Sequence, residues 1–271
     1  MVDTEKITSR DNQRLVNARK ARDGKETRRI FIEGRRLVDE ALRSKIVIEE
    51  CFFVEGFRER ELLATIDAKA PKIVEMPERI FRSLADTDNS QGIILIAERP
   101  RDGARDIEER LNSKSSSLPI VLFLKEINNP SNLGAILRTA EAAGVSGIVI
   151  SENSADVYSP RSLRAAMGAS FRLPIWDQAG FDEVLLWARK WGLESTATDI
   201  RAEKSYTHID WRQPRLLIFG SEAHGLSEKD LDRIDEQMQI PMENDVESLN
   251  LAVSAGIILF EAKRQFAANK A

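Results

Sequence analysis

The sequence predicts a two-domain α/β protein. Short apolar runs typical of buried strands alternate along the chain with longer stretches typical of helices. A polar, serine-rich stretch at residues 100–118 interrupts this alternation, and a length of 271 residues is enough for two domains. We therefore assign residues 1–99 to a small N-terminal domain, residues 100–118 to a linker with room for one short helix, and residues 119–271 to a larger second domain.

The first domain is expected to open with a helix over residues 4–20, with Ser9 or Asp11 as its N-cap. Cys51 lies in an apolar run and is the only cysteine, so an internal disulfide is excluded and we interpret this thiol as a small buried residue. After the first helix, strands are predicted at residues 31–33, 46–54, 72–76 and 92–97, with helices between them at residues 34–43, 58–68 and 77–84.

The second domain continues the alternation from a strand at residues 120–124. Its first helix, at residues 133–143, is rich in small residues and is expected to end at Gly144 as a C-cap. A long apolar helix is predicted at residues 249–266, close to the end of the chain. Between these helices we predict strands at residues 147–150, 193–198, 216–219 and 240–242, and helices at residues 160–169 and 181–191.

The composition argues against several classes of function. The formal net charge of −4 disfavours a generally basic nucleic-acid binder, although residues 1–36 carry eleven Lys and Arg against six acidic residues. Two histidines and one cysteine argue against a transition-metal site. Neither GxGxxG nor GxxxxGK[ST] occurs, so no dinucleotide site or P-loop is predicted. Since the sequence has no signal-peptide pattern and no apolar stretch long enough to span a membrane, we expect a cytoplasmic protein.

Three segments combine polar side chains or glycine with a predicted strand end or helix start. They are residues 128–138 (NNPSNLGAILR), residues 219–226 (FGSEAHGL), and residues 240–242 (IPM) with 248–250 (SLN). In open α/β sheets, ligands bind where the C-terminal ends of strands lead into such loops. These segments resemble the three signature motifs of the SpoU/TrmH family in the SPOUT superfamily, whose members are RNA ribose 2′-O-methyltransferases. The resemblance covers residues 120–266, while ITSRDNQRL and FIEGRRLVDEAL resemble a small ribosomal-protein-like substrate-binding domain.

The resemblance implies S-adenosylmethionine as the cofactor, a deep trefoil knot in the second domain, and a homodimer formed through that domain. By position in the motifs, the cofactor contacts are expected at Gly220, Ile240, Leu249 and Met242. Glycine suits position 220 because the backbone must approach a ligand closely there. No metal is implied.

The resemblance also assigns catalysis to five polar residues, which act when a ribose 2′-hydroxyl attacks the methyl group of the cofactor. Arg138 is the proton acceptor or its organiser, and Asn132, Glu222, Ser248 and Asn250 orient it and the ribose. A guanidinium stays protonated at accessible pH. We therefore expect Arg138 to hold an RNA phosphate and assist proton loss, with Glu222 orienting it through a charge-assisted hydrogen bond.

Structured RNA is the expected substrate, and ribosomal RNA, 23S in particular, is favoured over tRNA because the tRNA enzymes of the family generally lack this N-terminal domain. Two alternatives stay open: a tRNA 2′-O-methyltransferase, and a non-catalytic RNA-binding or ribosome-assembly factor that keeps the knot as a scaffold. Methylation of a base nitrogen is disfavoured by the asparagine–arginine first motif. RNA contacts are predicted at Arg10, Asn12, Arg35, Arg36, Arg161 and Arg164.

Overall fold

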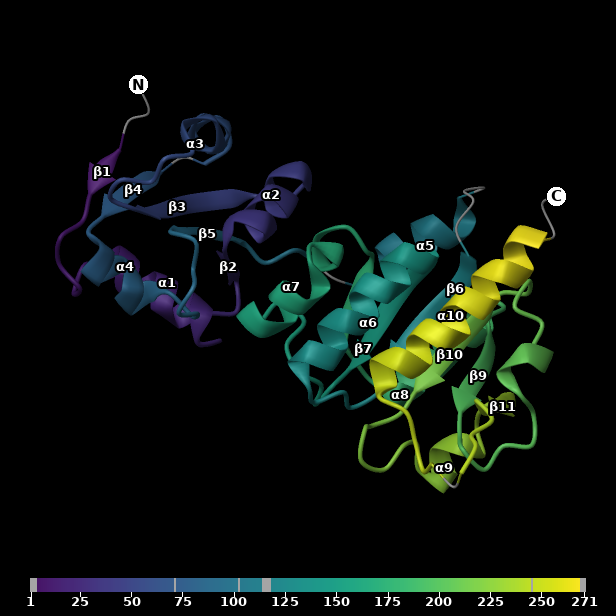
Figure 1. Ribbon diagram of the computed structural model, residues 1–271. Coiled ribbons are helices and arrows are strands. Elements are labelled where there is room, and N and C mark those ends of the chain that lie inside the picture. Colours follow the sequence, from purple (N-terminus) through teal and green to yellow (C-terminus); the bar gives the residue numbers. More distant parts are fainter. Residues whose placement is uncertain (1–3, 71, 102, 114–117, 245, 269–271) are drawn as a thin grey trace. The chain divides into compact units, whose positions relative to one another are not determined.

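The computed structural model describes residues 4–70, 72–101, 103–113, 118–244 and 246–268. The chain forms two compact units (Figure 1). The N-terminal unit comprises Met1–Arg101 and Tyr158–Arg172, and the C-terminal unit comprises Asp102–Val157 and Leu173–Ala271. The segment Tyr158–Arg172 therefore leaves the second unit and packs with the first.

The N-terminal unit is built on a five-stranded sheet in the order β1-β4-β3-β5-β2. Strand β5 runs antiparallel to both of its neighbours, and the other two pairings are parallel. Its strands are β1 (Glu5–Lys6), β2 (Arg29–Glu33), β3 (Ile48–Val54), β4 (Ile73–Met76) and β5 (Ile93–Glu98). Its helices are α1 (Gln13–Arg22), α2 (Arg35–Arg43), α3 (Arg60–Asp67), α4 (Glu78–Leu84) and α7 (Pro160–Ala166), with a 3₁₀ turn η1 (Ala169–Phe171).

The prediction of one helix over residues 4–20 was wrong. Glu5 and Lys6 pair in parallel with β4, and the buried Ile7 continues this extended segment. Helix α1 begins only after Asn12, whose side chain accepts a hydrogen bond from the backbone N–H of Arg14 at 2.9 Å. This is an ordinary N-cap, so neither Ser9 nor Asp11 caps the helix.

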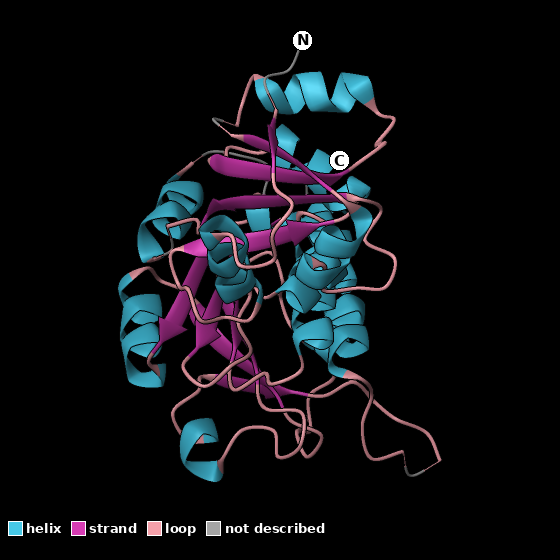
Figure 2. Cartoon of the chain, turned by 90° about the vertical axis from the view of Figure 1, so that its left-hand side faces the viewer, coloured by secondary structure: helices cyan, strands magenta, loops and turns pink. Residues whose placement is uncertain are grey.

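The C-terminal unit contains a six-stranded sheet in the order β11-β9-β10-β6-β7-β8, in which all pairings are parallel. Helices flank the strands in both units (Figure 2). The strands are β6 (Leu118–Leu124), β7 (Val145–Ser151), β8 (Ile175–Ala179), β9 (Glu194–Thr198), β10 (Arg215–Phe219) and β11 (Glu236–Met238). The helices are α5 (Ala104–Asn112), α6 (Pro130–Ala143), α8 (Phe181–Lys190), α9 (Glu228–Leu231) and α10 (Leu251–Ala268), with a 3₁₀ turn η2 (Tyr206–His208).

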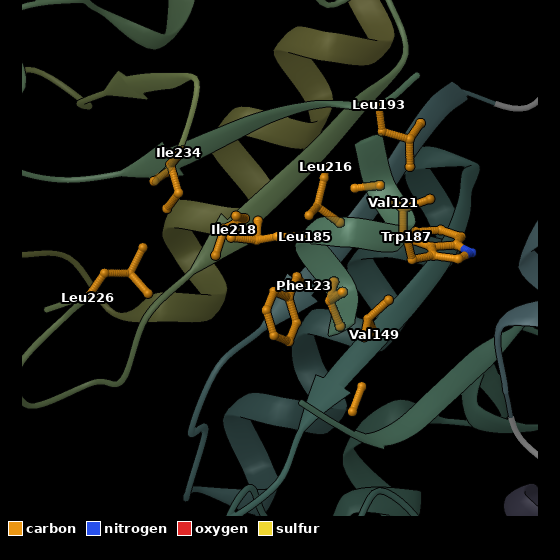
Figure 3. Close-up of a cluster of buried hydrophobic side chains, with 14 of the residues drawn as sticks. Val121, Phe123, Val149, Leu185, Trp187, Leu193, Leu216, Ile218, Leu226 and Ile234 are labelled. Carbon is orange, nitrogen blue, oxygen red and sulfur yellow. The ribbon is translucent and has the colours of Figure 1, made fainter. Parts of the chain in front are cut away.

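One face of this sheet is covered by α5 and α8. Alternate residues of the central strands, such as Phe123 and Ile218, point to this face, where they meet Leu185 and Trp187 of α8 (Figure 3). Parallel strands covered by helices must be apolar on both faces, which explains why β6 and β10 are continuous apolar runs. Helix α6 ends at Gly144 in a left-handed C-cap, as predicted.

Two predicted elements of the C-terminal unit differ in the structure. Residues 240–242 are not a strand; the strand is β11, Glu236–Met238, which pairs with β9. After it, Gln239 donates its N–H to the carbonyl of Lys204, and Pro241 has no N–H with which to extend a ladder. The helix predicted at 160–169 ends at Ala166, because Met167 and Gly168 are left-handed. In the described part of the chain, no helix is long and apolar enough to cross a membrane.

Candidate active site

The three segments singled out in the sequence meet at one place in the C-terminal unit. Asn132 of α6 donates from Nδ2 to Glu222 Oε1 at 2.7 Å. Asn250, which precedes α10, donates from Nδ2 to Asn132 Oδ1 at 3.2 Å. These bonds join residues that are far apart in the chain, so they depend on α6 and α10 lying side by side (Figure 1). The two helices are in contact, with Gly256 of α10 facing Thr139 of α6.

The N-terminus of α10 sets the direction of each hydrogen bond in the network of Asn250, Asn132 and Glu222. The Oδ1 atom of Asn250 accepts from the backbone N–H groups of Ala252 at 3.0 Å and Val253 at 3.4 Å, as an N-cap does. Its amide NH₂ must therefore point away from the helix, towards Asn132. Asn132 is free for this contact because Asn129 caps α6, accepting from the N–H of Ser131 at 2.9 Å.

Glu222 is carried by the loop of residues 220–227, called here the Glu222 loop. Ser221 and Gly225 exchange two backbone hydrogen bonds, at 3.1 and 2.9 Å. A Cβ atom at Gly220 would lie 2.3 Å from the carbonyl carbon of Gly225. Glycine is required at position 220 because the backbone of Gly225, in the same loop, lies close to it. This contact within the loop holds Glu222 in place.

Arg138 does not join the Asn132–Glu222–Asn250 chain. Its side chain is exposed and makes no hydrogen bond or ion pair with any residue that the structure describes. The hydrogen bond of Glu222 that the structure shows goes to Asn132, so the expected orientation of Arg138 by Glu222 stays a prediction. Arg138 is six positions beyond Asn132 on α6, which places it about 9 Å further along the helix and on a different side.

The expected cofactor residues surround the C-terminal edge of the sheet. Gly220 follows β10, and Ile240 and Met242 follow β11. Leu249 and Ser248 come just before α10; Leu249, like Ile240 and Met242, is half-buried, whereas Ser248 is exposed. Parallel strands end at the same edge of a sheet, so these loops share one side of the unit.

Sequence reasoning missed a further loop at this edge. Strand β9 lies between β10 and β11, and beyond its end Asp199 donates its N–H to the carbonyl of Met238 at 2.9 Å. Ile200, the next residue, is 63% exposed although it is a large apolar side chain. Hydrogen bonds from Arg201 lower the pKa of Asp199 and hold this turn. Only the strand order, which sequence alone does not provide, places this loop between the other two.

The predicted RNA contacts all lie in the N-terminal unit. Arg10 and Arg36 are exposed, and neither side chain forms an ion pair with a residue in the described ranges. Arg35 is different, because it pairs with Asp39 and Glu59, and its hydrogen bonds to these two carboxylates raise its pKa. On α7, Arg161 is exposed, whereas Arg164 pairs with Asp86 at 2.8 Å; Asn12 is the cap of α1.

Metal-ligating residues do not cluster in the part of the chain that the structure describes: no group of three or more His, Cys, Asp or Glu side chains there could hold an ion. The side chains that meet at the site are two amides and one carboxylate. Such groups position a substrate and exchange protons.

Two protein-family models match this chain, each over a different part of it. The model of the SpoU rRNA methylase family matches residues 119–260, and that of the MRM3-like substrate-binding domain matches residues 12–95. An uncharacterised tRNA/rRNA methyltransferase of Synechocystis sp. is 30% identical over 268 residues, 97% of this chain and 95% of the relative. The 23S rRNA (guanosine(2553)-2′-O)-methyltransferase RlmP of Bacillus subtilis is 28% identical, over 95% of this chain and 98% of its own.

A solved structure has the same fold over nearly the whole chain. The AdoMet-bound rRNA methyltransferase from Sinorhizobium meliloti superposes with a TM-score of 0.84 at 30% sequence identity, covering 96% of this chain and 98% of its own. The similarity therefore extends over both units and is not limited to the three motifs.

Proposed function

The chain belongs to the SpoU rRNA methylase family, and we propose that it transfers a methyl group from S-adenosylmethionine to a ribose 2′-hydroxyl of ribosomal RNA. The observation that carries this proposal is the hydrogen-bonded chain from Asn250 through Asn132 to Glu222. It brings one residue from each of the three motifs together at the edge of the sheet where ligands bind. A protein that used this fold only as a scaffold would not need these three side chains in one network.

The residues at this edge suit S-adenosylmethionine. Ile240, Met242 and Leu249 are half-buried and Ile200 is largely exposed, so apolar surface is available for an adenine ring. The loop after Gly220 offers backbone groups beside it. When bound, the cofactor supplies a methyl group on a positively charged sulfur. The protein residues must then hold the ribose hydroxyl in line with that methyl group and take up one proton.

We assign RNA binding to the N-terminal unit. Its sequence matches a substrate-binding domain, and RlmP, a relative over nearly its whole length, is named for 23S rRNA. Exposed Arg10, Arg36 and Arg161 offer positive charge for phosphates. Arg138, exposed on α6, is available to hold a phosphate of the bound RNA. We also propose a cytoplasmic location, where the bacterial rRNA of relatives such as RlmP is found.

We further propose a homodimer formed through the C-terminal unit, and a trefoil knot within it. Val253 and Phe260 of α10 are 51% and 50% exposed, and residues seven apart share one face of a helix. An apolar stripe of this kind supports a partner surface. A Phe260→Glu variant that stays dimeric in sedimentation equilibrium would argue against this interface.

The function is tested by incubating the purified protein with methyl-labelled S-adenosylmethionine and with separate pools of rRNA and tRNA, then mapping 2′-O-methyl groups by nuclease digestion and mass spectrometry. Label on a ribose of 23S rRNA is expected. Label in tRNA alone would show that tRNA, and not rRNA, is the substrate. If the protein transfers no methyl group even to RNA purified from cells that lack the gene, the non-catalytic alternative is favoured.

A further inference from the structure

The hydrogen-bond chain at the site leaves one strong acceptor without a partner. The cap of α10 fixes the amide of Asn250, Asn250 fixes the amide of Asn132, and Asn132 can then only donate to Glu222. Glu222 Oε1 accepts this bond, and Oε2 has no hydrogen-bond partner among the residues that the structure describes. A carboxylate has about four lone-pair sites, so Oε2 can accept a further proton or hydrogen bond.

Three features separate Glu222 from an ordinary surface carboxylate. Its loop is pinned by the Gly220–Gly225 contact and by the two Ser221–Gly225 hydrogen bonds. Its orientation is set by a neutral amide and not by a cation, so the charge of the carboxylate is left unneutralised. No ion pair of Glu222 with a described Lys or Arg competes for Oε2, and Arg138 stays apart from the chain.

We propose that Glu222 Oε2 is the atom that accepts the proton of the ribose 2′-hydroxyl. This assignment rests on the proposed function and adds the identity of the base to it. The O2′–H bond breaks and its proton passes to Oε2, while O2′ forms a bond to the methyl carbon. The electron pair of the broken S–CH₃ bond stays on sulfur. A carboxylate and a sulfonium thereby become a carboxylic acid and a neutral thioether, so both charge and atoms balance.

The assignment gives each of the other polar residues a separate task. Asn132 donates to Oε1 and holds the carboxylate, which makes it a positioning residue. Asn250 fixes Asn132. Arg138 keeps its proton and its charge throughout, as expected of a guanidinium, and binds phosphate.

Glu222→Gln is the decisive variant, because Gln can still accept from Asn132 through Oε1 and keeps the loop intact, but its NH₂ group cannot take a proton. We expect single-turnover methyl transfer to fall about 10²- to 10⁴-fold, the usual contribution of a general base. The melting temperature and the Kd for S-adenosylhomocysteine are expected to stay at the wild-type values. Glu228→Gln, at a carboxylate that is 85% exposed on α9, is the matched control and should leave all three unchanged.

A second variant gives a signature that a purely structural role would not produce. Asn132→Ala removes the bond to Oε1 that orients the carboxylate, so kcat should fall while the KM for RNA stays near the wild-type value. The acid limb of the wild-type pH–rate profile should be missing in Glu222→Gln. An Arg138→Lys variant should keep the wild-type limb.

A binding measurement completes the test without turnover. With S-adenosylhomocysteine present, wild-type protein should bind RNA with a 2′-hydroxyl at the target about tenfold more tightly than RNA with a 2′-deoxy target, the size expected of one hydrogen bond. Glu222→Ala should bind the two RNAs equally. Wild-type turnover in Glu222→Gln, or an acid limb that disappears in Arg138→Lys, would overturn the assignment. Failure of the proposed function is a different result, since wild-type protein would then transfer no methyl group to any RNA.

Discussion

Lys125 Nζ lies 2.9 Å from Asp230 Oδ2, and this ion pair holds the far end of the Glu222 loop. Asp230 also accepts from Ser227 Oγ at 2.7 Å, where the loop ends. At the start of the loop, the backbone N–H of Lys125 donates to the carbonyl of Phe219 at 2.9 Å. A single residue at the end of β6 thus fixes both ends of the loop that carries Glu222.

Lys125→Met should loosen that loop. Methionine keeps the apolar stem and the backbone hydrogen bond but leaves Asp230 without its cation, and the two side chains are only 18% and 14% exposed. We expect a loss of stability of about 1–2 kcal/mol and weaker binding of S-adenosylmethionine, measured by thermal unfolding and calorimetry.

The matched control is Arg105→Met, which breaks the Arg105–Glu109 ion pair on the exposed side of α5. These side chains are 87% and 64% exposed, and such pairs contribute little. Equal effects of the two substitutions would show that the Lys125–Asp230 pair does not hold the Glu222 loop.

The same ion pair predicts a pH dependence. Burial alone would raise the pKa of Asp230, but the hydrogen bonds from Lys125 and Ser227 outweigh it and lower the pKa below its ordinary value. A lowered pKa in the folded state adds stability above the unfolded pKa of about 3.9, and this stability is lost as pH falls through the folded value. The stability difference between wild type and Asp230→Asn, measured by denaturant unfolding, should therefore shrink below about pH 4. A constant difference across this range would contradict the assignment.

Asn250→Asp separates the helix cap from the hydrogen-bond chain. Aspartate caps helices as well as asparagine does, so the melting temperature should stay close to that of wild type. It has no NH₂ group, however, and cannot donate to Asn132 Oδ1, so Asn132 is expected to turn its own NH₂ towards position 250 and release Glu222. Methyl transfer should fall at least tenfold in single-turnover assays, because a loss of about this size is expected from one lost hydrogen bond to a charged group. Stability should be retained. Asn250→Ala should lower both methyl transfer and stability, because removing the N-cap lowers the free energy of unfolding by about 1 kcal/mol.

The sequence was sufficient to predict the α/β alternation, the C-cap at Gly144 and the three segments that form the site, because each depends on local pattern or on motif. It was not sufficient for the partner of Glu222. That partner, Asn132, is reached through the packing of α6 against α10, and the direction of the hydrogen bonds depends on which atom of Asn250 caps the helix. Helix propensity over residues 4–20 was overridden by pairing of Glu5 and Lys6 with β4.

Strand order carries the other information that the sequence lacks. The loop with Ile200 has no motif, and only the position of β9 between β10 and β11 brings it to the site. Likewise, residues 158–172 lie within the part of the sequence that matches the methylase family, but their contacts are with the N-terminal unit. Arg161 and Arg164 are therefore grouped with Arg35 and Arg36 by the fold and not by their sequence positions.

Arg35 and Arg36 are adjacent in the sequence, but they should affect RNA binding differently. Arg36 is exposed without an ion-pair partner in the described ranges, whereas Arg35 is held by Asp39 and Glu59. Arg36→Ala should weaken RNA binding and lower the slope of log Kd against log salt concentration by about 1, as one lost phosphate contact does. Arg35→Ala should leave the slope nearly unchanged and lower the melting temperature instead, because two carboxylates lose their cation. Filter binding at several salt concentrations distinguishes the two. An unchanged slope for Arg36→Ala would remove this residue from the RNA surface, and a reduced slope for Arg35→Ala would mean that RNA phosphate displaces its carboxylate partners.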